Sequence, residues 1–217
     1  EGGKNESEEE LLARQLARNN LNIRFYYDKI KQNKDGKKLV DNLKNILEYP
    51  LSVIVFNFVD MLSHARTEMQ MIRELAGDES AYRSLTLSWF KHSPLHDLFK
   101  ELAGKKVRLV LTTDHGMVRV NNPIKVIGDR NTTTNLRYKQ GRNLNYNPKE
   151  VFEITDPQKV HLPKTNISST YIFATNDDFF AYPNNYNHYV KYYKDTFQHG
   201  GVSLEEMLVP VITLTPK

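Results

Sequence analysis

The sequence contains no cysteine. Disulfide bonds, iron–sulfur clusters and thiolate-bound metals are therefore excluded, and any metal would be held by His, Asp or Glu, which suits zinc or manganese. Long apolar runs are also missing, since no stretch approaches the ~20 apolar residues of a membrane-spanning helix. The opening residues, EGGKNESEEE, are acidic and polar where a signal peptide is basic and then apolar. These features predict no membrane span and a cytoplasmic location.

A large charge of one sign is missing too. The 217 residues include 30 basic and 26 acidic side chains, for a formal charge of +4. Nucleic-acid binding requires clustered charge, so this balance does not indicate it. The hydrophobic share of 39% is ordinary for a soluble protein, and the length allows one domain with a sizeable core or a domain and a half.

Helix and strand signals alternate in the first half of the chain. Ser7 and Glu10 have capping-box spacing and open a predicted helix to about Asn20. Gly36 interrupts the next segment. The remaining predicted helices cover 39–47, 65–77, 79–91 and 93–102, the last opened by Ser93-Pro94 and stopped at Gly104.

Two apolar runs, 51–59 and 107–112, are short and β-branched, as buried parallel strands are. Helices alternating with such strands predict an α/β fold with a mostly parallel sheet flanked by helices.

The sequence changes character after residue 116. Short β-like runs at 117–120, 124–127, 151–154 and 170–174 lie among Asn, Pro, Thr and Gly. The segment 186–193 is rich in aromatics and fits either a helix or a strand, and 209–215 reads as a last strand, at an edge because of Pro210. We therefore predict a core over about 10–116 and 195–217, with an irregular β-rich insertion or cap over about 117–194.

Three polar clusters follow predicted elements, where open parallel sheets place their sites. The first, Asp60-Met-Leu-Ser-His64, follows the strand 51–59, and its spacing places a carboxylate and an imidazole on one side of a helix or turn. The second, Thr112-Thr-Asp-His-Gly116, contains the adjacent Asp114 and His115, which reach one site only if the chain has left the strand; Gly116 permits such a turn.

The third cluster is His199-Gly-Gly-Val-Ser-Leu-Glu-Glu206, in which two glycines allow the backbone to pass close to a site and Ser203 can cap a short helix. Each cluster alone has an ordinary explanation: an N-cap Asp, a corner, or a flexible loop. Their combination favours a metal site. The other histidines, His92, His96, His161 and His188, have no comparable setting, although His188 is a reserve candidate.

In this order, the three motifs resemble those of the alkaline phosphatase superfamily, and in detail the PglZ domain. The surrounding chain, including 130–139, resembles PorX-type response regulators of Bacteroidetes, in which a receiver domain precedes the PglZ domain and the protein governs a secretion system. The resemblance implies an alkaline-phosphatase-like core and two zinc ions. Asp60, His64 and His199 would bind one ion, and Asp114 with His115 would bind part of the second. Two metals about 3.5–4 Å apart stabilise the attacking and leaving oxygens of an in-line displacement at phosphorus.

Members of this superfamily also use a further Asp and a Thr or Ser nucleophile from strand ends that precede the Asp60 segment. We see no strand ending in such a residue before Pro50 and assign Thr112 and Thr113 structural roles. The expectation is a domain incomplete at its N-terminus, with its nucleophile upstream of Glu1 and no activity of its own.

The loop 128–142 contains four basic residues and one acidic residue, Asp129; the basic residues are Arg130, Arg137, Lys139 and Arg142. It is either a solvated loop or a substrate-binding segment that contacts phosphates, with Tyr138 stacking on a base.

These features lead to two hypotheses. The first is a zinc-dependent phosphodiesterase or phosphatase acting on phosphodiesters, with oligonucleotides or cyclic nucleotides as candidate substrates. A phosphoglycerate mutase or a sulfatase fits the flanking sequence less well. The second is a signalling module whose zinc site stabilises the fold or a homodimer, with the receiver domain and signalling proteins as partners.

Overall fold

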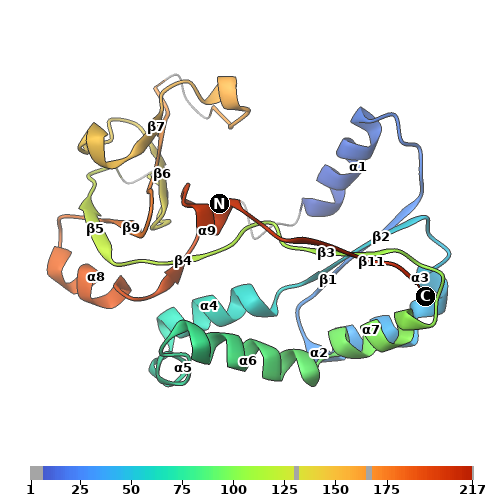
Figure 1. Cartoon of the computed structure of the whole chain (residues 1–217). Coiled ribbons are helices and arrows are strands. Elements are labelled where there is room, and N and C mark those ends of the chain that lie inside the picture. The colour runs from blue at the N-terminus through green and yellow to red at the C-terminus, as the bar shows by residue number, and fades with distance from the viewer. Residues whose placement is uncertain (1–6, 130–131, 165–167, 217) are drawn as a thin grey trace. The chain divides into compact units, whose positions relative to one another are not determined.

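The computed structural model describes residues 7–129, 132–164 and 168–216 (Figure 1). The chain forms two compact units. The first contains residues 1–62 and 75–107, and the second contains 63–74 and 108–215. Helices account for 40% of the described residues and strands for 22%, a mixture that fits the α/β fold expected from the sequence. No helix within the described ranges is both long and apolar enough to cross a membrane.

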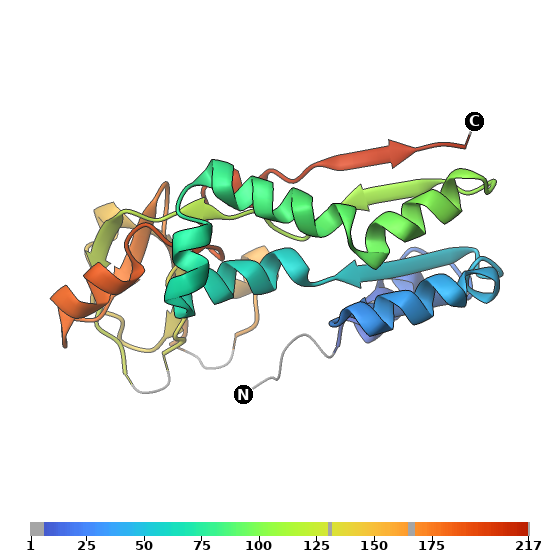
Figure 2. The same cartoon turned by 90° about the horizontal axis from the view of Figure 1, so that it is seen from below.

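Two parallel strands form the sheet of the first unit, β1 (Phe25–Ile30) and β2 (Leu51–Phe56). They lie side by side in Figures 1 and 2, in a register that runs from Phe25 opposite Leu51 to Ile30 opposite Phe56. The strand β1 was missed because its sequence, FYYDKI, is too polar for a buried strand. A strand therefore does precede the Asp60 segment, although it ends at Ile30 and not at an Asp, Thr or Ser.

The helices of this unit are α1 (Glu8–Arg18), α2 (Asn33–Asp41), α3 (Leu43–Ile46), α6 (Glu79–Lys91) and α7 (Pro94–Ala103). The core of this unit consists of residues from β1, α2, α3 and α7, namely Ile30, Leu39, Leu43, Ile46 and Leu98. The predicted helices 79–91 and 93–102 are confirmed, including the N-terminal Pro94 and the end at Gly104.

Three local predictions in this unit are wrong. Ser7 makes no side-chain cap hydrogen bond, so the predicted capping box is not formed. The predicted helix 39–47 is divided at Asn42 into α2 and α3. Gly36 lies inside α2, where an added Cβ would be 2.7 Å from the Pro94 Cβ; it allows α2 to approach α7 closely and does not break the helix.

The helix α4 (Phe58–Glu68) is followed by α5 (Gln70–Leu75). The predicted strand 51–59 therefore ends earlier, at Phe56, and the chain becomes helical before Asp60.

Within the described residues, the part of the second unit after residue 107 is built from short strands and two short helices. The strand β3 (Leu109–Thr112) pairs antiparallel with β11 (Val211–Leu214), and β4 (Val118–Arg119) pairs antiparallel with β10 (Phe197–Gln198). The strand β5 (Asn122–Lys125) pairs parallel with β9 (Asp178–Ala181). A three-stranded antiparallel sheet contains β6 (Tyr138–Gly141), β8 (Thr170–Phe173) and β7 (Phe152–Ile154). The helices are α8 (Tyr186–Tyr193) and α9 (Leu204–Met207), with single 3-10 turns at Pro148–Glu150 and Pro157–Val160.

Two small apolar clusters form the core of this unit. One contains Ile124, Val126, Ile172, Ala174 and Phe180, and the other Val118, Val120, Phe179 and Ala181. Three of the four predicted β-like runs between 117 and 174 contain a strand, and the run 124–127 overlaps the end of β5; the segment 186–193 is helical. The boundaries of the predicted core and insertion remain a prediction.

The strand pairing differs from a mostly parallel sheet. In the described ranges, β1–β2 and β5–β9 are the parallel pairs, and the other ladders are antiparallel. The prediction that 107–112 is a buried parallel strand is wrong: β3 pairs antiparallel with β11, and Val110 is 51% exposed. Apolar composition alone does not distinguish a buried strand from one whose faces remain open.

Candidate metal centre

The helix α4 carries both residues of the first motif. Asp60 is in its first turn and His64 follows one turn later, so the helical spacing places the two side chains on the same face. The predicted proximity of this carboxylate and imidazole therefore follows from local structure alone.

His115 lies in the loop that follows β3. Its backbone N–H donates to Asp114 Oδ1 at 3.1 Å, while the Asp114 side chain is 78% exposed. The His115 Nδ1 is 3.0 Å from the carbonyl oxygen of Gly116. A carbonyl can only accept a hydrogen bond, so Nδ1 must carry the proton, and the lone pair of His115 is left on Nε2.

Gly116 allows the loop after β3 to pack closely against the backbone of α9, because glycine has no Cβ. A Cβ at this position would lie 1.9 Å from the Glu205 carbonyl oxygen. The Gly116 N–H donates to the Glu206 carbonyl oxygen at 3.0 Å, which ties the loop to α9. The glycine is thus required by the approach of another backbone segment, and not by a left-handed conformation.

His199 follows β10 and precedes two glycines with different roles. Gly200 has a φ of 106°, which favours glycine. Gly201 lies against the Ala174 carbonyl and the Arg137 guanidinium, each 2.6 Å from where its Cβ would be. Ser203 then precedes α9 as its N-cap, as predicted. The His-Gly-Gly segment is therefore a tightly packed turn and not a flexible loop.

These segments bring three imidazoles together. The rings of His115 and His199 are stacked with centroids 4.0 Å apart and an interplanar angle of 11°. The His64 ring lies edge-on to His199, with centroids 6.0 Å apart. All three histidines belong to the second unit, whereas Asp60 belongs to the first. The resemblance had placed His64 with Asp60 and His199 and had assigned His115 to the second ion.

Residues 1–214 match the family model described as the BREX system PglZ alkaline phosphatase-like domain. The chain belongs to the PglZ family. No curated protein matches the sequence. Membership indicates a hydrolase of the phosphoesterase type, in a superfamily that commonly uses metal ions. The more specific resemblance to PorX-type regulators remains a prediction.

In this PglZ domain, two of the four basic residues of the loop 128–142 do not have the predicted substrate-binding role. Arg137 is completely buried and Lys139 is 2% exposed. The Lys139 ammonium donates to the Thr133 carbonyl at 2.9 Å and lies 5.0 Å from the centre of the Tyr182 ring. Neither side chain can reach a substrate phosphate from these positions, which contradicts their assignment to substrate binding. Arg142 is exposed, and Arg130 lies outside the described residues.

Arg137 and Glu206 form a buried ion pair that was not predicted. Arg137 Nε and Nη2 donate to the two carboxylate oxygens of Glu206 at 3.0 and 2.5 Å. Burial alone would raise the pKa of the Glu206 carboxyl, but hydrogen bonds from Arg137, Gly201 and Ser203 outweigh it, so the pKa is lowered. Residue spacing gave no signal for this pair, because Arg137 lies in the predicted loop 128–142 and Glu206 is 69 residues away.

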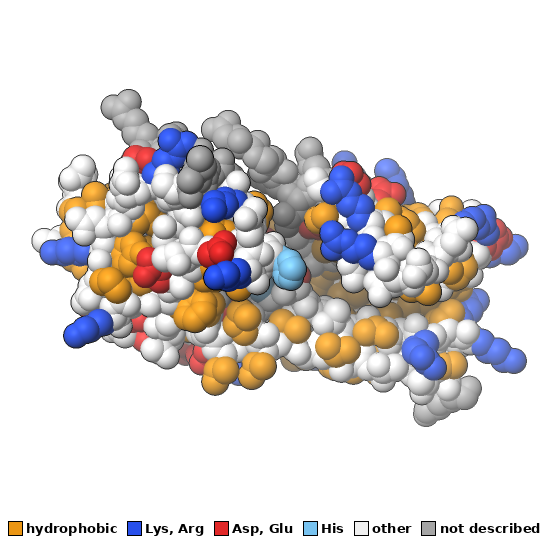
Figure 3. All heavy atoms as spheres, turned by 90° about the horizontal axis from the view of Figure 1, so that it is seen from above, with side chains coloured by type: hydrophobic (Ala, Val, Ile, Leu, Met, Phe, Trp, Pro, Cys, Tyr) orange, Lys and Arg blue, Asp and Glu red, His pale blue; other side chains and the backbone are white. Residues whose placement is uncertain are grey.

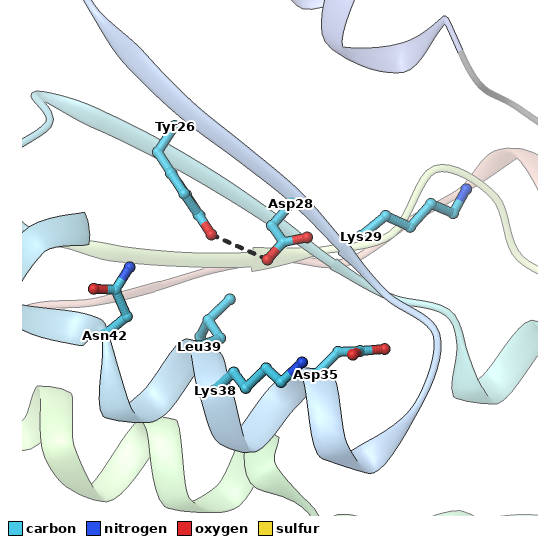
Figure 4. Close-up of a pocket in the computed structure, with 7 residues that line it drawn as sticks. All are labelled: Tyr26, Asp28, Lys29, Asp35, Lys38, Leu39 and Asn42. Atoms are coloured by element: carbon cyan, nitrogen blue, oxygen red, sulfur yellow. Dashed lines mark hydrogen bonds between the residues drawn. The ribbon is translucent and has the colours of Figure 1, made fainter.

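A separate pocket of about 330 Å³ lies in the first unit, against β1 and α2 (Figure 4). It contains no predicted site residue; its lining is Tyr26, Asp28, Lys29, Asp35, Lys38, Leu39 and Asn42. The Tyr26 hydroxyl donates to Asp28 Oδ2 at 3.0 Å, and burial, followed by this carboxylate, raises the pKa of Tyr26 to about 12. The Lys29 side chain extends away from this pair because successive strand residues face opposite sides. Its ammonium donates to Glu8 Oε1 at 2.9 Å.

Proposed function

We propose that this PglZ domain is a zinc-dependent phosphodiesterase or phosphatase. The observation that carries the proposal is the convergence of His64, His115 and His199 from three separate segments of the chain. Histidines that are merely structural have no reason to gather in this way.

The donor set fits zinc. Imidazole nitrogen and carboxylate oxygen are the ligands of catalytic zinc sites, which use three protein groups and leave a position open. The hydrogen bond from His115 Nδ1 to a backbone carbonyl is also typical of metal-binding histidines, because it orients the ring and leaves Nε2 free to ligate. His64 and His199 are the proposed companions of His115 in this site, and Asp60 and Asp114 are the proposed additional ligands of a two-ion centre.

Bound zinc would supply Lewis acidity and lower the pKa of a coordinated water towards about 7. The residues of the chain position the metal ligands. Gly116 and Gly201 allow backbone segments to approach so closely that the His115 and His199 rings are stacked before any substrate arrives. Such preorganisation reduces the ordering that binding would otherwise require.

Phosphodiesters, with oligonucleotides and cyclic nucleotides as candidates, are the proposed substrates. Exposed Arg142 could contact a neighbouring phosphate, since arginine presents forked donors to phosphate oxygens. On the face shown in Figure 3, basic side chains occur beside acidic ones and do not form one extended patch, so this face supports local phosphate contacts more than long nucleic-acid tracks.

The resemblance to PorX-type proteins supports a further proposal, that the domain acts within a two-component response regulator controlling protein secretion. The partners would be a receiver domain and signalling proteins. A non-enzymatic role, with zinc stabilising a signalling module, is the alternative.

The test begins with zinc binding, measured by competition with a chromophoric chelator. We expect His115→Ala and His199→Ala to lose most of the affinity, while His92→Ala, an exposed helix-end control, binds like the wild type. Hydrolysis of a nitrophenyl phosphodiester and of a nitrophenyl monoester is then measured in the natural protein that carries this chain. Zinc binding without turnover would support the signalling alternative. Equal zinc affinity in all variants would contradict the site.

A further inference from the structure

The ion pair between Arg137 and Glu206 is almost completely buried. The side chains are 0% and 2% exposed. Besides its two bonds to Glu206, the guanidinium donates to the backbone carbonyls of Thr175 at 3.3 Å and Asn176 at 3.0 Å, and also to that of Asp178. These contacts hold Arg137 in one orientation and thereby hold the carboxylate.

The Glu206 carboxylate binds the segment that carries His199. Its Oε1 accepts the backbone N–H of Gly201, two residues after His199, at 2.8 Å. Its Oε2 accepts the backbone N–H and the hydroxyl of Ser203, at 3.1 and 2.8 Å. The path of the chain immediately after His199 is thus determined by one carboxylate.

The backbone of the same residue binds the segment that carries His115. The Glu206 carbonyl oxygen accepts the N–H of Gly116 at 3.0 Å, and Gly116 in turn provides the carbonyl that orients the His115 ring. One residue therefore anchors both loops through different groups. The loops are distant in sequence, yet their imidazoles stack with centroids 4.0 Å apart.

We propose that Glu206, oriented by Arg137, is a positioning residue that sets the placement of His115 relative to His199. The expected effect on metal affinity rests on the proposed function. The placement of the two histidine rings by Glu206 does not depend on a bound metal. It also gives the acidic end of the His-Gly-Gly motif a role that motif spacing does not reveal.

A purely stabilising role would have a different signature. Buried ion pairs contribute little to stability relative to apolar side chains of similar volume, and replacing both partners is often neutral. An apolar pair could restore packing, but it cannot accept the N–H groups of Gly201 and Ser203. Positioning therefore predicts that a folded apolar double variant still loses the arrangement of the histidines.

The experiment compares the double variant Arg137→Met/Glu206→Leu with Val126→Ala. The control removes methyl groups from the core of the same unit and leaves the hydrogen bonds of the ion pair in place. Thermal unfolding establishes which proteins are folded. NMR of the histidine rings, without metal, then reports the ring-current shifts of the stacked His115 and His199, and chelator competition reports zinc affinity.

We expect the double variant to lose the ring-current shifts and to bind zinc about 10–100-fold more weakly, the range for residues that orient metal ligands. The Val126→Ala control should retain the ring-current shifts and the wild-type zinc affinity at a melting temperature comparable to that of the double variant. If the double variant does not fold, Arg137→Lys and Glu206→Gln provide the same comparison with smaller changes.

Unchanged histidine shifts in a folded variant would overturn the inference, whatever the zinc affinity. Wild-type protein that shows the ring-current shifts but binds no zinc would instead contradict the proposed function and leave the positioning role supported. The two failures are therefore distinguishable.

Discussion

Replacing Lys139 by methionine should stabilise the second unit at neutral pH. Lys139 is 2% exposed, and its ammonium binds the Thr133 carbonyl and faces the Tyr182 ring; it forms no ion pair with a carboxylate in the described part of the chain. Burial lowers its pKa from 10.5 to about 8. Below pH 8 the lysine is charged in both the folded and unfolded states, and the folded state bears the full cost of burying the charge.

The size of this cost follows from the pKa. A difference of about 2.5 pKa units at 1.36 kcal/mol per unit corresponds to about 3 kcal/mol. The lost hydrogen bond and ring contact offset part of it, since each is worth roughly 1 kcal/mol or more. We therefore expect Lys139→Met to raise the free energy of unfolding by roughly 1–2 kcal/mol at pH 7, in line with the replacement of other buried charges.

The pH dependence provides a sharper check. Above pH 8 the folded wild type releases this proton while the unfolded chain retains it up to about 10.5, so wild-type stability rises with pH in that window. The variant lacks this contribution, and its advantage should shrink by about 2 kcal/mol between pH 7 and pH 9.5.

Urea unfolding followed by near-ultraviolet circular dichroism, which senses the tyrosines, would measure both values. A substrate-binding Lys139 would behave differently, with no gain in stability and a loss of substrate affinity. A variant that is less stable by the same amount at both pH values would refute the argument from burial.

Three other predictions test the packing and the metal centre. Gly116→Ala should destabilise the protein by about 3 kcal/mol or more because its Cβ would overlap the Glu205 carbonyl, whereas Gly104→Ala, with no atom within 4 Å, should be nearly neutral in thermal unfolding. Ile172→Ala should cost about 2–5 kcal/mol because the side chain is fully buried, whereas Ile212→Ala, 46% exposed, should change urea stability by far less. Zinc at 100 times its dissociation constant should stabilise the wild type by about 2.7 kcal/mol, a gain that EDTA reverses and His199→Ala lacks; an equal gain in that variant would argue against the site.

The sequence alone determined the features that depend on local spacing. Helical periodicity placed α6 and α7 correctly, because capping residues and apolar spacing act within a few residues. The same is true of Asp60 and His64, which share a helix face, and of the three motifs whose order led to the PglZ family.

Only the tertiary structure decided how the segments between these motifs are used. Arg137 and Lys139 have the composition of a phosphate-binding loop, but Arg137 directly precedes β6 and Lys139 lies within it. Both side chains are buried, where one binds Glu206 and the other lies against Tyr182. The stacking of His115 on His199 likewise depends on two backbone approaches that only glycine permits. Burial and long-range pairing are set by contacts between residues far apart in the chain, and these cannot be read from the spacing of neighbours.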